Sequence, residues 1–255
     1  MAGVRVVSMN VNGVRAAARK GLSSLLDELG PDAVCLQEVR AAPDQVPPLV
    51  DGFHATWHPA ERKGYSGVGT LTRAAPLAVR VGSGYPEHDR EGRVIVTELP
   101  ELTLLNVYAP SGTTGELRQA VKMEFLERFL GFVAGLVAEG RPLLLCGDVN
   151  VAHREVDLKK WRSNQRSSGF LPEEREWFGR LLDVGLVDVV RRLAGDDAEV
   201  YSWWTQRAGA RERNVGWRID YQLATPDLAE RAVAFDVPRF PVLSDHAPVV
   251  VDYAL

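Results

Sequence analysis

The chain has 255 residues, of which 45% are hydrophobic and 25% are charged, and its formal net charge is -4. This length and hydrophobic content suffice for a sizeable buried core and exclude a mainly disordered chain. The acidic balance gives no overall indication of nucleic acid or an acidic membrane surface as a partner.

The two cysteines, Cys35 and Cys146, each lie in an apolar run, where a reduced thiol behaves as a small hydrophobic side chain. We therefore expect neither a disulfide framework nor a zinc site. The first residues, MAGVRVVSMN, show no secretion pattern, and no run reaches the ~18 apolar residues that a membrane span needs. These features predict a cytoplasmic protein.

Strand and helix patterns alternate in the first half of the chain. Residues 4–10 and 32–39 each predict a strand, and leucines at helical spacing between them predict a helix from Val14 that stops at Gly30 and Pro31. Without a helical pattern to separate them, the next short strands are predicted to be antiparallel neighbours. These strands are FHATW, SGVGTLTR, LAVRV, RVIVTEL and LTLLNVY, at residues 53–57, 66–73, 77–81, 93–99 and 102–108.

Residues 116–139 carry the clearest helical pattern. Its apolar face is predicted to consist of Leu117, Val121, Phe125, Phe129, Phe132, Val133 and Leu136. A buried strand at 142–147, a long polar loop at 153–171 and a helix at about 172–184 should follow. The remaining strands are predicted near 201–205, 216–224, 231–237 and 246–253.

No linker composition divides the chain, so we expect one domain over residues 1–255. Strand–helix–strand units occur in both halves, and strands outnumber helices. Two mixed sheets that pack face to face with helices outside would satisfy this pattern.

The stretch LLLCGDVN leads from a buried strand directly into Asp148 and Asn150. In an extended chain, residues two apart point to the same side, so these two side chains would face one spot. The stretch is equally consistent with an ordinary polar turn that closes a strand.

Polar residues stand at the ends of several other predicted strands. Strand ends on one edge of a sheet form a common rim, so we expect these side chains to converge. The set comprises Asn10, Asn12, Glu38, Tyr108, Asp148, Asn150, Asp220, Asp245 and His246. Taken singly, each also has a structural interpretation: Glu38 as an exposed strand-end charge, or Asp220 as a partner of Arg218.

If the set converges, four carboxylates meet beside few cations: Glu38, Asp148, Asp220 and Asp245. Of the basic side chains, only Arg40 and Arg218 lie beside them in sequence, and an extended strand would put Arg218 on the face of Asp220. Like charges this close raise one another's pKa or require a cation. Oxygen ligands of this kind suit Mg²⁺ or Mn²⁺, whereas one histidine among carboxylates is a poor zinc site.

The same residues carry a family resemblance. The chain resembles the exonuclease III / class II apurinic–apyrimidinic endonuclease family of the endonuclease/exonuclease/phosphatase superfamily, from Val6 to Val249. The motifs are SMNVNGVRA, LQEVR, GYSGVGTLTR, NVYAP, CGDVNVAHREVDL, NVGWRIDYQL and SDHAPV. The resemblance implies a four-layer α/β sandwich and Mg²⁺-dependent hydrolysis of DNA on the 5′ side of an abasic site. Family members often add 3′→5′ exonuclease and 3′-phosphatase activities.

Matched to the family's motifs, Glu38 is implied to be the principal metal ligand, helped by Asn10 and Asp245. Asp148 is implied to take the proton of the attacking water. The other implied roles are a phosphate support for Asn150, a phosphate or leaving-oxygen contact for Tyr108, and a contact to a non-bridging oxygen for His246, oriented by Asp220. A second metal site is the alternative role of Asp148, Asn150 and His246.

Two positions depart from the family pattern. Asn12 stands where some members have an acid that touches the metal, which weakens the case for a second metal ion. SGTT follows NVYAP where many members continue with an asparagine, which weakens a phosphate contact there.

Contacts to DNA are expected from two basic segments despite the net negative charge, since binding depends on local charge. The candidates are Arg154, Lys159 and Lys160 in residues 154–166, and Arg207 in residues 207–218. The resemblance implies that Trp203, Trp217 and Ile219 line a small apolar pocket for a flipped, base-free sugar. Core burial is the alternative for the tryptophans.

Three functions stay open on these observations. The leading one is a monomeric repair nuclease acting on double-stranded DNA, abasic or with 3′ ends. A phosphatase or phosphodiesterase of the same superfamily with a non-DNA substrate is the second. The third, a non-catalytic relative that only binds nucleic acid, should have lost acids from the rim, and apart from the Asn12 question none is missing.

Overall fold

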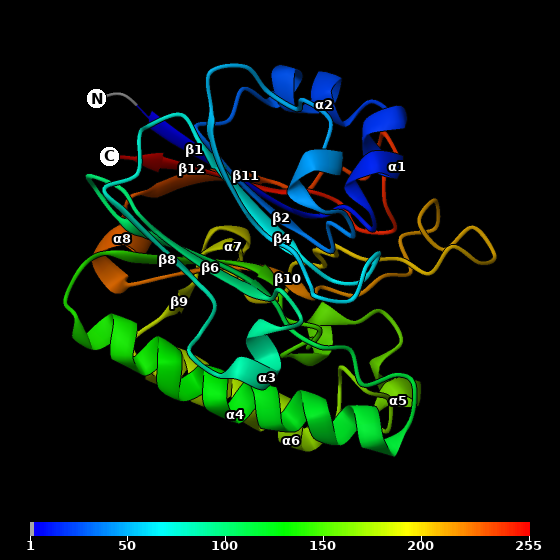
Figure 1. Ribbon diagram of the computed structural model, residues 1–255. Coiled ribbons are helices and arrows are strands. Elements are labelled where there is room, and N and C mark those ends of the chain that lie inside the picture. The colour runs from blue at the N-terminus through cyan, green and yellow to red at the C-terminus, as the bar shows by residue number, and fades with distance from the viewer. Residues whose placement is uncertain (1–2) are drawn as a thin grey trace.

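The computed structural model describes residues 3–255. Two six-stranded sheets are stacked face to face, with α1 and α2 outside one sheet and α4 and α6 outside the other (Figure 1). This confirms the predicted four-layer α/β sandwich.

The first sheet has the strand order β11-β12-β1-β2-β4-β3. Its strands are β11 (Ala232–Asp236), β12 (Val249–Ala254), β1 (Gly3–Asn10), β2 (Ala33–Gln37), β4 (Val68–Thr72) and β3 (His54–His58). Only β1 and β2 pair in parallel, because the helical segment between them returns the chain to the same end of the sheet.

The second sheet has the order β5-β6-β7-β8-β10-β9. Its strands are β5 (Ala78–Val81), β6 (Val94–Glu98), β7 (Thr103–Tyr108), β8 (Leu143–Asp148), β10 (Asp220–Ala224) and β9 (Val187–Asp188). β7 and β8 are parallel, with the long helix α4 as their crossover, and the other pairs are antiparallel.

The helices vary greatly in length. They are α1 (Val14–Arg19), α2 (Leu22–Leu29), α3 (Pro86–Asp89), α4 (Glu116–Ala138), α5 (Trp161–Asn164), α6 (Pro172–Asp183), α7 (Val189–Ala194) and α8 (Pro226–Glu230). Two short 3-10 turns, η1 (Pro43–Gln45) and η2 (Glu155–Asp157), complete the set. In the described chain no helix has the length and apolarity to cross a bilayer.

Three apolar layers hold the four structural layers together. One packs α1 and α2 on the first sheet, a second joins the two sheets, and a third packs α4 and α6 on the second sheet. Cys35 and Cys146 are free thiols in the middle layer, as expected from their apolar surroundings. Alternation along β1 assigns Val6 to the layer between the sheets and Val7 to the outer layer.

The space between the sheets becomes polar toward one end. Val6 on β1 gives way to Ser8 and then to Asn10, all fully or almost fully buried. On β8, Leu144 and Cys146 lead in the same way to Asp148. This end of the sandwich therefore presents buried polar side chains from both sheets.

Several predicted elements differ from the structure in the N-terminal half. The helix expected from Val14 to Gly30 is two helices, because Gly21 between them adopts a left-handed conformation (φ +102°). Gly30 ends the second helix as predicted, also in a left-handed conformation. The five short strands are antiparallel neighbours only within each sheet, since the chain crosses to the other sheet between β4 and β5.

Other differences lie in the C-terminal half. The strand expected at 201–205 is only a pair of isolated bridges at Trp203, and the one at 216–224 is regular only from Asp220. The predicted loop 153–171 contains η2 and α5, and the short elements β9, α7 and α8 were not predicted. Two residues of the predicted apolar face of α4 are exposed, Leu117 to 88% and Val121 to 37%, so this face is buried only from Phe125 onward.

Candidate active site

Three polar residues form one row across the second sheet. Tyr108 pairs in register with Asp148 on the parallel strand β8, and Asp148 pairs in register with Asp220 on the antiparallel strand β10. Residues that lie directly opposite each other on paired strands point to the same face of the sheet. The strand pairing of the sheet therefore brings together three residues that are far apart in sequence.

Asn10, from the first sheet, joins this row to Glu38. Its side-chain amide donates to Oε2 of Glu38 and to Oδ2 of Asp148, both at 2.9 Å. Its own oxygen accepts the backbone N–H of Asn12 at 2.9 Å. Asn10 thus holds two carboxylates in place across the gap between the sheets.

Asp148 is buried, and its charge is poorly compensated. Burial and the neighbouring charge of Asp220 raise its pKa to about 7, although His246 and the hydrogen bond from Asn10 act in the opposite direction. A carboxylate with such a pKa can accept a proton near neutral pH.

His246 lies between Asp220 and Asp148. Its Nδ1 donates to Oδ2 of Asp220 at 2.9 Å, and its Nε2 lies 3.9 Å from Oδ2 of Asp148. Burial alone would lower the pKa of His246, but the charge and hydrogen bond of Asp220 outweigh it and raise the pKa to about 10. Ser202 donates to Asp220 at 2.6 Å and fixes the carboxylate from the other side. His246 is therefore a protonated imidazole at neutral pH.

Asn150 faces the same space as Asp148, but not because the chain is extended. Asn150 has a left-handed backbone (φ +57°), so the argument from extended geometry was wrong. Its N–H donates to Oδ1 of Asp148 at 2.9 Å, and its side-chain amide donates to the carbonyl of Ala109 at 3.0 Å. A tight turn after β8 therefore places the two side chains together.

A cavity of about 320 Å³ opens at these residues. Its polar side is formed by Asn12, Glu38, Arg40, Tyr108, Asp148, Asn150, Asp245 and His246, and its remaining wall by Ser111, Thr113, Ser168, Gly169, Trp203, Trp217 and Ile219. The predicted convergence of the rim is confirmed. Asn10 and Asp220 lie behind this surface and act through the residues that they contact.

The apolar wall is built around two tryptophans. Trp203 and Trp217 bond to each other through their backbones, and their rings meet edge to face at 6.3 Å. Trp204 points away and is buried, as expected for one member of the adjacent pair. Ile219, next on the face of Trp217, adds to the same wall.

Asp245 connects the polar side of the cavity to its apolar wall. It accepts hydrogen bonds from the side chains of Asn12 at 2.8 Å and Trp203 at 3.0 Å. Burial would raise its pKa, but the charge on His246 and these two hydrogen bonds lower it. Asp245 is therefore ionised, and Asn12, which donates to it through the side-chain nitrogen, also lines the cavity.

The donor set fits a hard divalent cation. Glu38, Asp245 and Asn12 carry oxygen atoms and line one cavity, together with Asp148, whose buried charge is poorly compensated. The tight cluster of Asp148, Asp220 and His246 also has the spacing of a metal site, but Asp220 already holds His246 and Ser202. Arg40 pairs with Glu38 at the surface, where such a pair contributes little and a cation can compete.

A second group of acids and histidine, Glu87, His88 and Glu124, also has the spacing of a metal site. Arg128 reaches both carboxylates at 2.9 Å, so the group already contains its cation. It serves as an ion-pair cluster that joins α3 to α4.

Arg218 does not belong to the site. It was expected to share a face with Asp220, but its guanidinium is buried against Asp157 at 2.8 Å and Asp188 at 2.8 Å. The guanidinium also lies over the ring of Tyr221, so the side chain is on the face of Tyr221 and not on that of Asp220. The pairing of Asp220 with Arg218 is thereby excluded.

The basic residues expected to contact DNA are all exposed. Arg154 pairs with Asp196 at 2.5 Å and Lys159 with Glu199 at 2.6 Å. Within residues 3–255, Lys160 and Arg207 form no ion pair. Because exposed pairs are weak, all four side chains can reach a polyanion.

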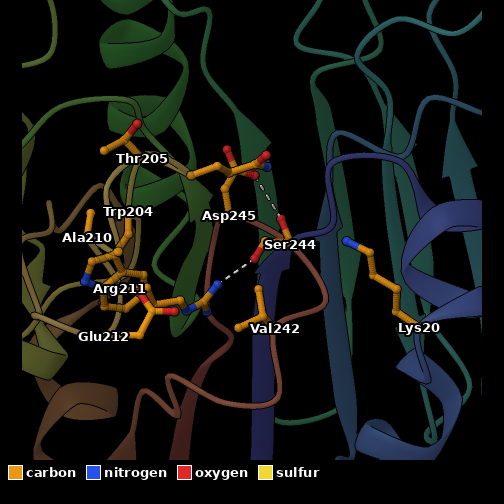
Figure 2. Close-up of a pocket in the computed structure, with 11 residues that line it drawn as sticks. Lys20, Trp204, Thr205, Ala210, Arg211, Glu212, Val242, Ser244 and Asp245 are labelled. Atoms are coloured by element: carbon orange, nitrogen blue, oxygen red, sulfur yellow. Dashed lines mark hydrogen bonds between the residues drawn. The ribbon is translucent and has the colours of Figure 1, made fainter.

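A second cavity, of about 350 Å³, lies on the other side of Asp245 (Figure 2). Arg211 there donates to the carbonyls of Ser244 at 2.6 Å and His246 at 3.2 Å. Lys20 donates to the carbonyl of Leu243 at 3.0 Å. These two cations hold the loop that carries Asp245 and His246.

Sequence reasoning missed part of the wall. Ser168 and Gly169 lie in a segment without periodicity, and Ser202 precedes the tryptophans as an unremarkable serine. The only local signal at Gly169 is that an aromatic residue, Phe170, follows the glycine. This combination is too common in protein sequences to identify a functional position.

Comparison with known proteins agrees with this architecture. The family model described as "Endonuclease/Exonuclease/phosphatase family" matches residues 7–246. An exodeoxyribonuclease of Bacillus subtilis is 41% identical over 96% of this chain and 98% of its own length. The DNA repair nuclease APEX1 of Danio rerio is 39% identical over 100% of this chain and 83% of its own.

Among solved structures, an AP endonuclease from Archaeoglobus fulgidus superposes with a TM-score of 0.90. It is 28% identical and aligns over 99% of this chain and 100% of its own. Since both the family match and the relatives span nearly the whole sequence, this chain belongs to the endonuclease/exonuclease/phosphatase family, in its exodeoxyribonuclease and AP endonuclease branch.

Proposed function

We propose that this protein is a DNA-repair nuclease that hydrolyses the phosphodiester on the 5′ side of an abasic site in duplex DNA and also trims 3′ ends. The supporting observation is a single cavity in which a charged side, with Asp148 and His246, faces an apolar wall of Trp203, Trp217 and Ile219. An abasic nucleotide costs least to extrude, because it has lost its pairing and much of its stacking.

Hydrolysis requires a proton acceptor for the attacking water. Asp148 serves as that acceptor, since its pKa of about 7 matches the task and Asn10 holds one of its oxygens. The water oxygen bonds to phosphorus, one of its protons passes to Asp148, and the bond from phosphorus to the 3′ oxygen breaks. The departing 3′ oxygen takes up a proton from solvent water. The products are a 3′ hydroxyl and a 5′ phosphate on the abasic residue.

The phosphate is held by hydrogen-bond donors. His246 carries a proton on Nε2, Asn150 presents its side chain, and Tyr108 keeps its hydroxyl proton because burial and nearby acids raise its pKa well above 10. Fixed donors of this kind stabilise the charge that develops in the transition state. Asp220 acts indirectly, by holding His246 in its charged form.

Mg²⁺ is the proposed cofactor, and Mn²⁺ can replace it at the same oxygen donors. Glu38, Asp245 and Asn12 would hold the ion. The Asn12 oxygen replaces the Asn10 oxygen expected earlier, because Asn10 already accepts the N–H of Asn12. A bound divalent ion supplies charge neutralisation of the phosphate.

Duplex DNA is the proposed partner, and the monomer is the proposed active form, since all residues of the cavity come from one chain. Arg154, Lys159, Lys160 and Arg207 would contact phosphates beside the cavity. A small phosphate ester bound in the cavity would not contact these exposed cations, whereas duplex DNA would. The cations therefore favour DNA over a non-DNA substrate.

The test is a 5′-labelled duplex with a single abasic site, incubated with and without EDTA. We expect one incision, abolished by EDTA, and slower removal of nucleotides from a recessed 3′ end on intact duplex. An inositol phosphate serves as the competing substrate. Release of phosphate from it without incision of the duplex would reject the proposal.

The metal assignment has its own test. In Glu38→Ala the Mg²⁺ concentration for half-maximal rate should rise about tenfold or more, as expected for a lost ligand or its immediate support. Binding of DNA in EDTA should stay at the wild-type level. An unchanged metal titration would remove Glu38 from the metal site.

A further inference from the structure

A buried ion pair lies behind the wall of the active-site cavity. Nζ of Lys122 on α4 lies 2.5 Å from Oε1 of Glu174 on α6, and both side chains are 0% exposed. Burial lowers the pKa of Lys122 although Glu174 acts against it. Buried ion pairs are rarely the most stable way to join two helices, so the contacts of this pair beyond the helices matter.

The lysine contacts the catalytic turn. Its Nζ donates to the backbone carbonyl of Asn150 at 2.8 Å. Asn150 has the left-handed backbone conformation, which is costly outside glycine although asparagine tolerates it best. Lys122 therefore holds the peptide that aims the Asn150 side chain at the cavity.

The glutamate contacts the cavity wall. Oε2 of Glu174 accepts the backbone N–H groups of Gly169 at 2.6 Å and Leu171 at 3.0 Å. Gln119 donates to Oε1 at 2.9 Å and accepts the hydroxyl of Ser168 at 2.7 Å. One carboxylate thus fixes the backbone of the segment that contributes Ser168 and Gly169 to the wall.

Gly169 is closely packed against Asn150 and Trp217. A Cβ built on it would lie 3.2 Å from the carbonyl oxygen of Asn150 and 3.3 Å from the ring of Trp217. Its carbonyl also accepts the N–H of Ala152 at 2.7 Å. A small displacement of this segment would therefore change both the tryptophan wall and the position of Asn150.

We propose that Lys122 and Glu174 are a pair of positioning residues for the active site. The ammonium fixes Asn150 for the chemical step, and the carboxylate fixes the Ser168–Gly169 wall that excludes a base. This inference rests on the proposed nuclease function and extends it to two residues that lie outside the cavity.

Single substitutions separate the proposed role of Lys122 from that of Glu174. Lys122→Met removes the donor to Asn150, so kcat on the abasic duplex should fall about 10- to 100-fold, the range for misplaced catalytic groups, while KM changes little. Glu174→Met frees the wall but leaves the Lys122 amine as a donor. Its ratio of kcat/KM on abasic to intact duplex should fall about tenfold.

Trp177→Phe is the matched control. It removes another buried hydrogen bond between α6 and α4, from Nε1 of Trp177 to the carbonyl of Leu126 at 2.8 Å, away from the cavity. A purely structural ion pair would lower Tm, as this control does, without moving kcat or the substrate ratio. All rates are measured well below the lowest Tm of the series.

Each single variant leaves one member of the buried ion pair without its partner. The double variant Lys122→Met/Glu174→Met removes both charges and covers the case in which an unpaired charge prevents folding. It should fold and lose both kcat and selectivity, which supports the proposal. Folded variants that match Trp177→Phe in kcat and in the substrate ratio overturn it. Failure of the wild-type protein to incise the abasic duplex would instead reject the proposed function, so the two failures are distinguishable.

Discussion

Two buried charge clusters lie around the segment that leads into β10, and each contains aspartates that are buried from solvent. In the first, Asp157 accepts from Arg191 at 2.5 Å and from Arg218 at 2.8 Å. In the second, Asp148 faces Asp220 and His246. Asp157 and Asp148 are only nine positions apart in sequence, but their pKa values are shifted in opposite directions.

The cause is the number of cations. Burial would raise the pKa of both aspartates, but at Asp157 the charge of Arg218, with further bonds from Arg154 and Arg191, lowers it instead. Asp148 has no arginine partner in the described chain and reaches about 7. Balanced buried charge stabilises a loop, whereas unbalanced buried charge leaves a group ready to take a proton or face a cation.

The largest effect should come from the balanced cluster. Asp157→Asn leaves Arg191 and Arg218 with too little negative charge in a buried site, so the free energy of unfolding should fall by about 3 kcal/mol. The measurement is denaturant unfolding at pH 7. A loss below about 1 kcal/mol would mean that water reaches this cluster and that the contrast is smaller than the structure indicates.

Asp148→Asn should lower activity and leave stability intact, in contrast to Asp157→Asn. The amide keeps the shape of the carboxylate but accepts no proton, so kcat on the abasic duplex should fall at least ~10²-fold. Stability should stay the same or rise, because an uncompensated buried charge is removed. Near-wild-type turnover in a folded mutant would exclude Asp148 as the proton acceptor.

Trp217 lines the cavity that contains the unbalanced cluster, and its substitution tests whether the apolar wall selects the substrate. Trp217→Ala should enlarge the cavity and lower the ratio of kcat/KM on abasic to intact duplex about tenfold, with part of the cleavage activity retained. Circular dichroism shows whether the mutant is folded. An unchanged ratio would leave Trp217 with a packing role only.

The smallest effect is a shift in pH dependence. The folded-state pKa of His246, about 10, exceeds its ordinary 6.5, so its bond to Asp220 stabilises fully below about pH 6.5 and is lost as the pH rises through 10. Asp220→Asn removes the raising charge, so the alkaline limb of the pH–rate profile should move to lower pH. An unmoved limb would show that His246 is held charged by other groups.

The regular elements could largely be predicted from residue patterns. Alternation in β1 and the apolar face of α4 follow from local periodicity, which one stretch of chain carries by itself. The short elements α7, α8 and β9 could not be predicted, because elements of six, five and two residues give too little pattern and tertiary contacts decide their form. The isolated bridges at Trp203 were taken for a strand for the same reason.

For the site, the sequence supplied the residue types but not all of their neighbours. Asp148, Asp220 and His246 were identified from their places at strand ends and from family motifs. The register of β8 and β10 brings the two aspartates together, and a hydrogen bond to Asp220 adds His246, which precedes β12 of the other sheet. The alternative that paired Asp220 with Arg218 was wrong, because it rested on a local face argument that assumed an extended backbone, and Arg218 pairs with Asp157 and Asp188. No sequence pattern connected Lys122 with Glu174, which are 52 positions apart.

By itself, then, the sequence determined the layers, the family and the acidic rim, since these depend on periodicity and on motifs contained in short segments. The tertiary structure alone decided which buried charges are balanced. Coulomb interactions and desolvation depend on distances of a few ångströms between segments that the chain order does not reveal. That is why Asp157 and Asp148, two buried aspartates nine positions apart, end with opposite pKa shifts.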